Sequence, residues 1–305
     1  MPIHTKLMQA QTFPEILANR ATAALSFEVF PPKSDATYDH LRQILPELVA
    51  LRPDYMTVTY GAFGSNQGRT LEIAQSIQSQ FHLATACHLT CVTSSRSELD
   101  VILDEMAAAG IRNIVALRGD APQGQTSFTP PVDGFSHANE LVAHIRAREK
   151  AGRQPRFGLA VAGYPEKHME APSLEFDLLR LKEKVDAGAD CIITQLFYNN
   201  ADFFSFVDKA RALGITVPII PGLLPILSAK QIARILSLCG STLPPGLKQD
   251  LDAVGDDAAK AEEIGIRQCI KQARELIDRG VPGIHFYVLN KSTHMTQIMR
   301  GLGRL

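Results

Sequence analysis

The chain has 305 residues, of which 45% are hydrophobic and 21% are charged, and its 31 basic and 32 acidic side chains leave a formal net charge of −1. This balance gives no general attraction to nucleic acid or anionic lipid, so neither partner is expected. No apolar run approaches the roughly 18 residues that a membrane span requires, and the first 20 residues lack the apolar centre of a secretory signal. We therefore expect a cytoplasmic protein.

From Leu25 almost to the end of the chain, short apolar segments alternate with segments of helical period. Eight such units without a linker favour a closed (β/α)₈ barrel, the TIM barrel of the α/β class, over an open doubly wound sheet. The G-x-G-x-x-G fingerprint of a Rossmann fold is also missing after the first strand. The predicted strands are Leu25–Phe30, Tyr55–Tyr60, Ala84–Cys91, Asn113–Leu117, Phe157–Tyr164, Cys191–Phe197, Val217–Gly222 and Gly283–Leu289.

The glycines and loops between these units predict one barrel domain over residues 1–305, with residues 1–20 as a helical extension. Glycines that follow a helical segment and precede a strand are typical of helix ends. Phe128–Ser136 is predicted as a long loop on the catalytic face, and Gly240–Asp257 as an irregular insertion that leads into an extra helix. The glycines that mark helix ends are Gly110, Gly188, Gly214 and Gly280.

The fourth strand delivers Arg118, Gly119 and Asp120 at its carboxyl end, where ligands bind in barrels of this kind. A cation beside an anion is costly to bury there unless a function uses it. The alternative, an Arg-Gly-Asp adhesion site, requires an exposed loop tip in a secreted protein. The hydrophobic strand before it and the missing signal argue against that interpretation.

Polar side chains follow seven of the eight predicted strands. A barrel interior is normally filled by branched apolar residues, so this pattern indicates a large polar site for a cofactor and a substrate. Loops that begin at the strand ends explain any one of these residues, but explain seven strands less well. The residues are Glu28, Thr59, Tyr60, His88, Arg118, Asp120, Tyr164, His168, Gln195, Asn290 and Lys291.

Glu28 lies in the segment SFEVFPPK, between aromatic neighbours. Desolvation there would raise the pKa of its carboxyl and suit it to act as a general acid near neutral pH. The alternative is a carboxylate paired with Lys33 or another cation at the barrel mouth. The sequence leaves both interpretations open.

The cysteines do not predict a metal site. His88 lies within Cys87-His88-x-x-Cys91, but on a strand the two cysteines share one face and His88 points to the other. No second cluster of histidine and cysteine completes a site. The five cysteines, an odd number without a C-x-x-C pair, are expected to be reduced thiols.

The segment Glu175–Gly188 is predicted as an amphipathic helix whose apolar side faces the sheet. Asp177, Arg180 and Lys184 recur along another face. Such a face is either solvated or, beside the loop over the barrel mouth, able to bind phosphates or a ribose.

Nine motifs, in order and spacing, resemble the flavin-dependent methylenetetrahydrofolate reductases. The resemblance runs from about Leu25 to Gly303 and includes the helix GDDAAKAEEIGI; the length is similar to that of the short bacterial form, without the regulatory domain of the animal enzymes. The motifs are SFEVFPPK, VTYGA, HLTC, ALRGD, VAGYPEKH, LKEKVDAGAD, ITQLFY, IIPGLLP and HFYVLN.

The resemblance implies a (β/α)₈ barrel that holds FAD. NADH or NADPH would reduce the flavin, and the flavin would then reduce 5,10-methylenetetrahydrofolate to 5-methyltetrahydrofolate in a ping-pong order, which feeds one-carbon metabolism and methionine synthesis. The family often forms homo-oligomers. No residue pattern distinguishes NADH from NADPH.

The resemblance also implies roles for particular residues. Glu28 would be the acid that opens the folate ring, and Asp120 would lie near the flavin pyrimidine and contact the pterin. The substrate-side positions are Glu28, Asp120, Gln195, Gln231, Leu289 and Lys291. The cofactor-side positions are Thr59, Tyr60, Ala62, His88, Arg118, Gly119, Asp120, His137, Ala138, Tyr164, His168, Asp177, Arg180 and Lys184.

Three positions depart from the better-known members of that family. Lys291 stands where arginine is usual, which replaces a planar fork for a carboxylate by a point charge. His137 stands where tyrosine is common, and Ile235 replaces an aromatic residue that would provide a stacking surface. The departures are expected to change affinities rather than the chemistry.

Two other functions remain as alternatives. A flavin-independent barrel aldolase or lyase would use a lysine inside a strand, and the predicted strands contain none. A non-enzymatic binding barrel would not need Glu28 or the Arg118 and Asp120 pair. The visible spectrum of the purified protein separates these classes from the reductase.

Overall fold

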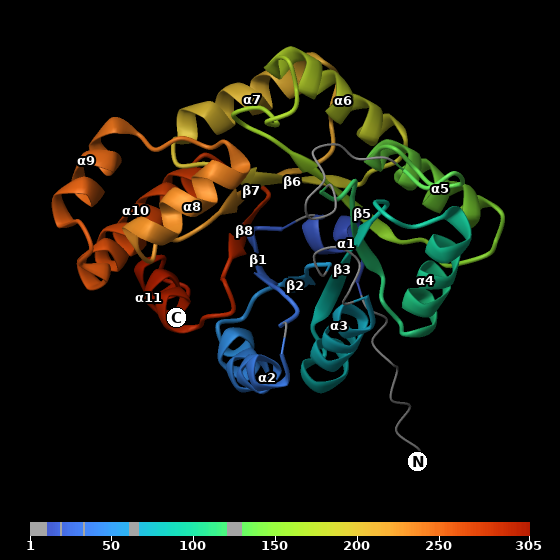
Figure 1. The fold of residues 1–305 in the computed structure, drawn as a ribbon, viewed down its shortest axis with the longest axis horizontal. Helices are drawn as coiled ribbons and strands as arrows, with labels where there is room; N and C mark the ends of the chain where they lie inside the picture. The colour runs from blue at the N-terminus through green and yellow to red at the C-terminus, as the bar shows by residue number, and fades with distance from the viewer. Residues whose placement is uncertain (1–10, 19, 33, 61–66, 121–129) are drawn as a thin grey trace.

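The computed structural model describes residues 11–18, 20–32, 34–60, 67–120 and 130–305. The described residues contain eight parallel strands that pair in chain order and close into a barrel when β8 meets β1 (Figure 1). The predicted (β/α)₈ fold class is therefore confirmed. The strands are β1 (Ala24–Val29), β2 (Tyr55–Val58), β3 (Ala84–Thr90), β4 (Asn113–Leu117), β5 (Gly158–Gly163), β6 (Cys191–Leu196), β7 (Ile219–Leu223) and β8 (Gly283–Tyr287).

Every strand overlaps its predicted segment, and the differences lie at the ends. The prediction for β4 is confirmed at both ends, whereas β8 ends at Tyr287 and not at Leu289. Leu289 and Asn290 have φ angles of 52° and 51°, in the left-handed region, which cannot continue a strand. The apolar pattern does not reveal this turn.

The helices surround the strands (Figure 1). The four glycines predicted at helix ends have φ angles of 76° (Gly110), 119° (Gly188), 79° (Gly214) and 79° (Gly280), so each supplies the left-handed residue that ends a helix. The helices are α1 (Phe13–Leu17), α2 (Asp35–Ala50), α3 (Gln67–Phe81), α4 (Arg96–Ala108), α5 (Ala138–Lys150), α6 (Leu174–Asp186), α7 (Asn200–Ala212), α8 (Ala229–Cys239), α9 (Pro245–Val254), α10 (Ala258–Asp278) and α11 (Thr293–Gly301).

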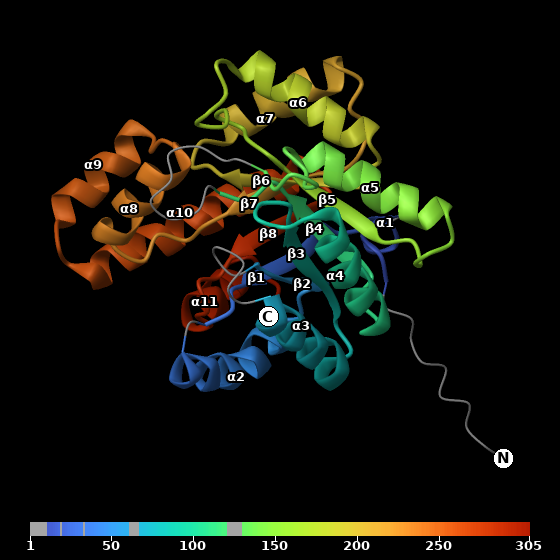
Figure 2. The ribbon, with the colours of Figure 1, turned by 45° about the vertical axis from the view of Figure 1, so that its right-hand side comes forward.

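The prediction that Gly240–Asp257 is irregular is wrong, because this segment contains helix α9. A proline is tolerated in the first turn of a helix, where its missing N–H has no intrahelical partner, and Pro245 is the first residue of α9. In both ribbon views α9 lies at the outer edge, with α8 and α10 between it and the strands (Figure 2). The extra helix predicted before the last strand is confirmed as α10.

Strand alternation separates the apolar residues of an outer core, beneath the helices, from those that point into the barrel. On β1, Phe27 and Val29 point outward into the core beneath the helices. Ser26 and Glu28, on the alternate positions, therefore point into the barrel. The cysteine pattern follows the same rule: Cys87 and Cys91 belong to the outer core, and all five cysteines are free thiols.

Helix α1 closes the amino-terminal end of the barrel. Phe13 is fully buried with its ring 5.3 Å from that of Tyr55, and its backbone N donates to Asn113 Oδ1 at 2.6 Å. A Cβ on Gly158 would lie 2.4 Å from the same Oδ1 atom, so this close approach requires glycine. The predicted helical extension over residues 1–20 is helical in its described part only from Phe13 to Leu17. No described helix has the length and apolar character needed to cross a bilayer.

A buried ion-pair network joins α5 and α6 to the starts of β5 and β6. Arg146 Nη1 donates to Glu149 Oε2 at 2.7 Å and to the Phe157 carbonyl at 2.8 Å, while Nη2 donates to Asp190 Oδ2 at 2.6 Å. Arg146 Nε donates to the Gly188 carbonyl at 2.9 Å. The side chains of Arg146, Glu149 and Asp190 are only 9–10% exposed.

Replacing Arg146 by methionine is expected to destabilise the fold by about 3–5 kcal/mol, because it leaves the buried Glu149 carboxylate without its cation and leaves Asp190 with Arg156 alone, at 2.6 Å. Urea denaturation measures this loss. The control is Lys248→Met, which removes an ion pair with Asp252 whose side chains are each 64% exposed and should cost less than about 1 kcal/mol. Similar losses in the two variants would contradict a structural role for the network.

Candidate active site

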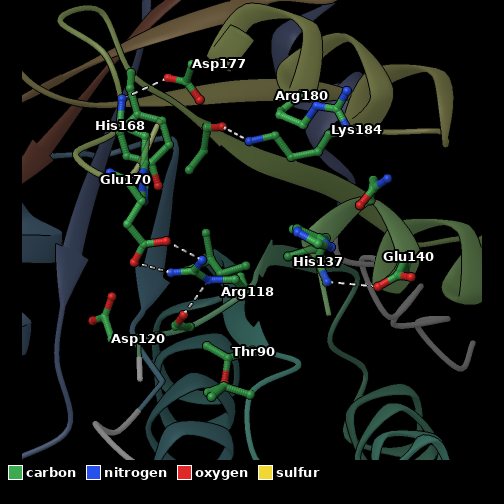
Figure 3. A pocket seen from close by; sticks show the side chains of 18 of the residues that line it. Thr90, Arg118, Asp120, His137, Glu140, His168, Glu170, Asp177, Arg180 and Lys184 are labelled. Atoms are coloured by element: carbon green, nitrogen blue, oxygen red, sulfur yellow. Dashed lines mark hydrogen bonds and ion pairs between the residues drawn. The ribbon is translucent and has the colours of Figure 1, made fainter. Parts of the chain in front are cut away.

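A cavity of about 540 Å³ opens at the carboxyl ends of β2 to β5, within the size range of about 300–1,000 Å³ typical of ligand sites (Figure 3). The sequence predicted the cofactor-side residues at this end, and Ala62 lies outside the described residues. All the other predicted cofactor positions line the cavity, namely Thr59, Tyr60, His88, Arg118, Gly119, Asp120, His137, Ala138, Tyr164, His168, Asp177, Arg180 and Lys184.

Arg118 lies at the centre of the cavity with its guanidinium bound by Glu170 (Figure 3). Nη1 donates to Glu170 Oε2 at 2.6 Å and Nη2 to Oε1 at 3.0 Å, the two-pronged geometry that arginine forms with carboxylates. This pairing raises the pKa of Arg118 and lowers the pKa of Glu170. Asp120, the anion next to Arg118 in the sequence, is exposed at the cavity edge.

Gly119 allows β4 to end in this way. Its φ angle is 90°, and a Cβ there would lie 2.4 Å from Val92 Cγ1 and 3.0 Å from Thr90 Cβ. No residue with a side chain adopts this backbone without strain and collision. The glycine between Arg118 and Asp120 is therefore a structural requirement of the cavity floor.

Helix α6 forms one wall of the cavity through Asp177, Arg180 and Lys184 (Figure 3). The prediction that these three residues share a face is confirmed, and that face is directed at the cavity. Lys184 Nζ donates to the Ala162 carbonyl at 2.5 Å, and burial lowers the pKa of Lys184 to about 8 although Asp177 opposes the shift. Asp177 Oδ2 accepts from His168 N at 2.9 Å, which ties the loop after β5 to α6.

Two rings line the same side of the cavity. The Tyr164 and His168 rings meet edge to face with centroids 4.7 Å apart. Burial raises the pKa of Tyr164 and lowers the pKa of His168, so both side chains favour their neutral forms. The cavity thus combines neutral rings with the cations of Arg118, Arg180 and Lys184.

Glu28 lies beside His88, and of the two interpretations left open by the sequence, the one in which desolvation raises its pKa is wrong. Burial alone raises the pKa of the Glu28 carboxyl, but the charge of His88 and the hydrogen bond of His285 outweigh it, so the net pKa is lowered. His285 Nε2 lies 3.1 Å and His88 Nε2 3.2 Å from Glu28 Oε2. The alternative partner named from sequence, Lys33, lies outside the described residues. The apolar neighbours in sequence, such as Phe27 and Val29, point to the opposite face of β1.

The remaining substrate-side predictions lie elsewhere at the barrel mouth. Of the described residues, Glu28, Gln195, Gln231, Leu289 and Lys291 do not line the cavity. Gln195 is the penultimate residue of β6, and Gln231 lies in the first turn of α8, where Gln231 Oε1 accepts from Leu227 N at 3.1 Å. Leu289 packs beside α8 in a cluster that includes Ile235, and Lys291 is exposed. These residues mark the half of the mouth formed by β6, β7 and β8.

Sequence reasoning missed Glu170, Ser26, Thr57 and His285. The last three occupy positions inside β1, β2 and β8, and Ser26 and His285 lie two residues before Glu28 and Tyr287, so period-two alternation from those residues would have identified them. Glu170 has a weaker signal, its place two residues after His168 in a loop already assigned to the site. Thr57 Oγ1 donates to Glu28 Oε2 at 3.3 Å.

Comparison with known proteins identifies the family. The family described as methylenetetrahydrofolate reductase matches residues 13–303. The Escherichia coli 5,10-methylenetetrahydrofolate reductase is 37% identical over 279 residues, which cover 92% of this chain and 90% of that protein. The chain belongs to the methylenetetrahydrofolate reductase family. The resemblance seen in the motifs is thereby confirmed.

Other relatives of the methylenetetrahydrofolate reductase family differ in length. The maize protein named methylenetetrahydrofolate reductase (NADH) 1 is 38% identical over 295 residues, 94% of this chain but 49% of its own length. The chain thus spans about half the length of the plant relatives it matches. A solved structure described as an uncharacterized protein from Clostridium thermocellum, which binds two copies of 5-methyl-5,6,7,8-tetrahydrofolic acid, shares the fold with a TM-score of 0.61 at 16% identity, covering 94% of this chain and 95% of that one.

The replacement Gly119→Ala is expected to cost about 1–3 kcal/mol more stability than Gly152→Ala, because the new Cβ must displace Val92 and Thr90. Gly152 is the matched control: its φ angle is 69°, but nothing lies within 4 Å of a Cβ there. Urea denaturation of both variants separates the collision from the backbone strain that they share. Equal losses of stability in the two variants would mean that Val92 and Thr90 move aside without a cost in free energy.

Proposed function

We propose that this chain is a methylenetetrahydrofolate reductase that uses FAD and a reduced nicotinamide to convert 5,10-methylenetetrahydrofolate to 5-methyltetrahydrofolate. The observation that carries the proposal is the cavity at the carboxyl ends of β2 to β5, where the described flavin-side positions of the family gather around Arg118. The family match over residues 13–303 supports the same conclusion. The Clostridium thermocellum protein supports it further, since a barrel of this fold is described as holding methyltetrahydrofolate.

The residues of the cavity fit a flavin dinucleotide. Arg118 and Lys184 offer cations to a diphosphate. Thr90 Oγ1 is buried in the cavity wall without a hydrogen-bond partner among the described residues, as expected of a group that bonds to a ligand. Bound FAD would supply the redox chemistry, taking electrons from the nicotinamide and passing them to the folate.

The remaining roles in the proposed reaction are assigned to side chains at the barrel mouth. Asp120, exposed at the cavity edge, is proposed to orient the flavin pyrimidine and the pterin by accepting their N–H groups. Gln195 and Gln231 carry amides to the other half of the mouth and are proposed to bind the folate or the nicotinamide, with Leu289 and Lys291 beside them. Glu28 is proposed to give the proton that the departing folate nitrogen needs, since an unprotonated amine leaves poorly.

We further propose a single catalytic barrel over residues 1–305 that works in the cytoplasm as a homo-oligomer and feeds methionine synthesis in a ping-pong order. Either NADH or NADPH is the donor. The direct test is the visible spectrum of the purified protein: flavin bands should bleach when NADH or NADPH is added without oxygen and return when 5,10-methylenetetrahydrofolate follows. A colourless protein that binds no added FAD would refute the proposal.

Arg118→Ala and Lys184→Ala are each expected to weaken FAD binding by about 10- to 100-fold, the loss that follows removal of a hydrogen bond to a charged group. Quenching of flavin fluorescence on titration of the apoprotein measures the affinity. Lys182→Ala is the matched control, since Lys182 lies on the same helix but pairs with Asp186 away from the cavity. Full flavin affinity in both test variants would overturn this assignment of the cations.

Glu28→Gln keeps the shape and hydrogen-bonding capacity of the side chain but cannot donate an acid proton. Reduction of the flavin by the nicotinamide should proceed at a near-normal rate, because that step needs no acid. Reduction of the folate should fall by at least about 10², the lower end for the loss of a general acid. Stopped-flow traces of the two half-reactions decide the matter, and equal losses in both would make Glu28 a structural residue.

A further inference from the structure

The contacts of Glu28 raise a question about its proton. A general acid must be protonated before it acts, yet the two histidines beside Glu28 favour its carboxylate form. All the described hydrogen bonds and ion pairs of the carboxyl use Oε2, from Thr57, His88 and His285. His88 Nε2 approaches within 3.2 Å but makes no hydrogen bond, whereas His285 Nε2 meets hydrogen-bond geometry at 3.1 Å.

His285 is held from its other side by Ser26. The Ser26 Oγ atom lies 2.8 Å from His285 Nδ1, and both residues are fully buried. They are direct partners in the β1–β8 register, two positions below Glu28 and Tyr287. The closure of the barrel thus aligns Ser26, His285 and Glu28 in a chain of hydrogen bonds that ends at the carboxyl.

The geometry assigns a direction to these bonds. The Ser26 hydroxyl lies 3.4 Å from the Ile284 carbonyl, which can only accept. With the Ser26 hydroxyl donating to that carbonyl, its oxygen is left to accept the N–H of His285 Nδ1 at 2.8 Å. Since the partner of one ring nitrogen sets the state of the other, any proton that His285 gains or loses is at Nε2, the nitrogen that faces Glu28.

We propose that Ser26 and His285 hold the proton that Glu28 delivers, with His285 as the proton store and Ser26 as the residue that fixes its ring. This inference rests on the proposed role of Glu28 as the acid. An imidazolium beside a carboxylate has the same composition as a neutral imidazole beside a carboxylic acid. The Nε2–H proton of His285 passes to the carboxylate of Glu28, which hands it on to the departing nitrogen. The N–H bond of His285 breaks, the O–H bond of Glu28 forms and breaks in turn, and an N–H bond forms on the folate. His285 is left in the neutral Nδ1–H form beside the Glu28 carboxylate.

The other titratable groups around this chain favour their neutral forms. Burial raises the pKa of Tyr55 on β2, of Cys191 on β6 and of Tyr287 on β8, so none supplies a charge near neutral pH. His88 on β3 is the remaining neighbour, and it lines the cavity instead of bonding to Ser26. The proton store is thus assigned to His285 by its hydrogen bonds on both nitrogens.

The first test reads the histidine directly, without any cofactor. Apoprotein labelled with ¹⁵N-histidine is titrated by NMR, and the His285 signals are assigned by their loss in His285→Gln. The neutral form should be the Nδ1–H tautomer in the wild type and should lose that preference in Ser26→Ala. A neutral Nε2–H tautomer in the wild type would overturn the proposal.

The second test uses the pH dependence of the separate half-reactions. His285→Gln can still donate a hydrogen bond to Glu28 but cannot carry a proton. Folate reduction should fall about 10-fold near neutral pH, and its descending alkaline limb should move to lower pH, because the pair has lost the group that carries its proton. Reduction of the flavin by the nicotinamide should stay near the wild-type rate.

The outcomes distinguish this inference from its alternatives. A uniform loss of folate reduction at all pH values, with the limb unmoved, would make His285 structural and reject the proton store. The control Thr85→Val removes a buried hydroxyl whose bond goes to the Leu83 carbonyl, and it should leave the limb in place. If wild-type protein reduces no folate at all, the proposed function fails, whereas the tautomer measured in the apoprotein still tests the store.

Discussion

Closure of an eight-stranded parallel barrel is the constraint on which the rest of this structure depends. Each strand must present alternate residues to the axis, and the register across the closing pair β1–β8 decides which of them meet. The amino-terminal end of the axis is filled by Phe13 and Tyr55, an apolar plug. Polar side chains therefore lie further along the axis, from Ser26 and His285 in the middle of β1 and β8 to Glu28 near the carboxyl end, where they can hydrogen-bond in sequence.

The carboxyl end of the barrel also presents a cation, Arg118, to which an anion can bind. The planar guanidinium of Arg118 lies at the cavity centre, and its Nη1 and Nη2 atoms both donate to the Glu170 carboxylate. Burying this cation is tolerable because a partner satisfies it, and a phosphate would satisfy it equally well. The side chain of Glu170 is 64% exposed, so Glu170 can leave Arg118 without itself becoming a buried, unpaired charge. A ligand anion would thus exchange with an internal one.

Local sequence patterns predicted what depends on neighbouring residues. The eight strands, the glycines after helices and the common face of Asp177, Arg180 and Lys184 all follow from short-range periodicity, and the structure confirms them. The contacts of Glu28 did not follow, because His285 is 257 positions away in the chain. Aromatic neighbours in the sequence of a strand point to the opposite face, so they say little about the environment of the residue between them. A sequence read along one strand cannot supply the register that closes a barrel.

The two halves of the mouth are built differently, and this difference bears on the order of the reaction. The β2–β5 half is a cavity whose walls are fixed by hydrogen bonds, such as those of Asp177 and Lys184. The β6–β8 half is shaped by α8 and by the left-handed turn at Leu289 and Asn290, where the Asn290 amide bonds both the N–H and the carbonyl of Phe30. If a flavin takes the first half, the nicotinamide and the folate share the second and must occupy it in turn. Under the proposed function, such a shared half-site would need the acid Glu28 only while folate is bound, which agrees with the proposed ping-pong order.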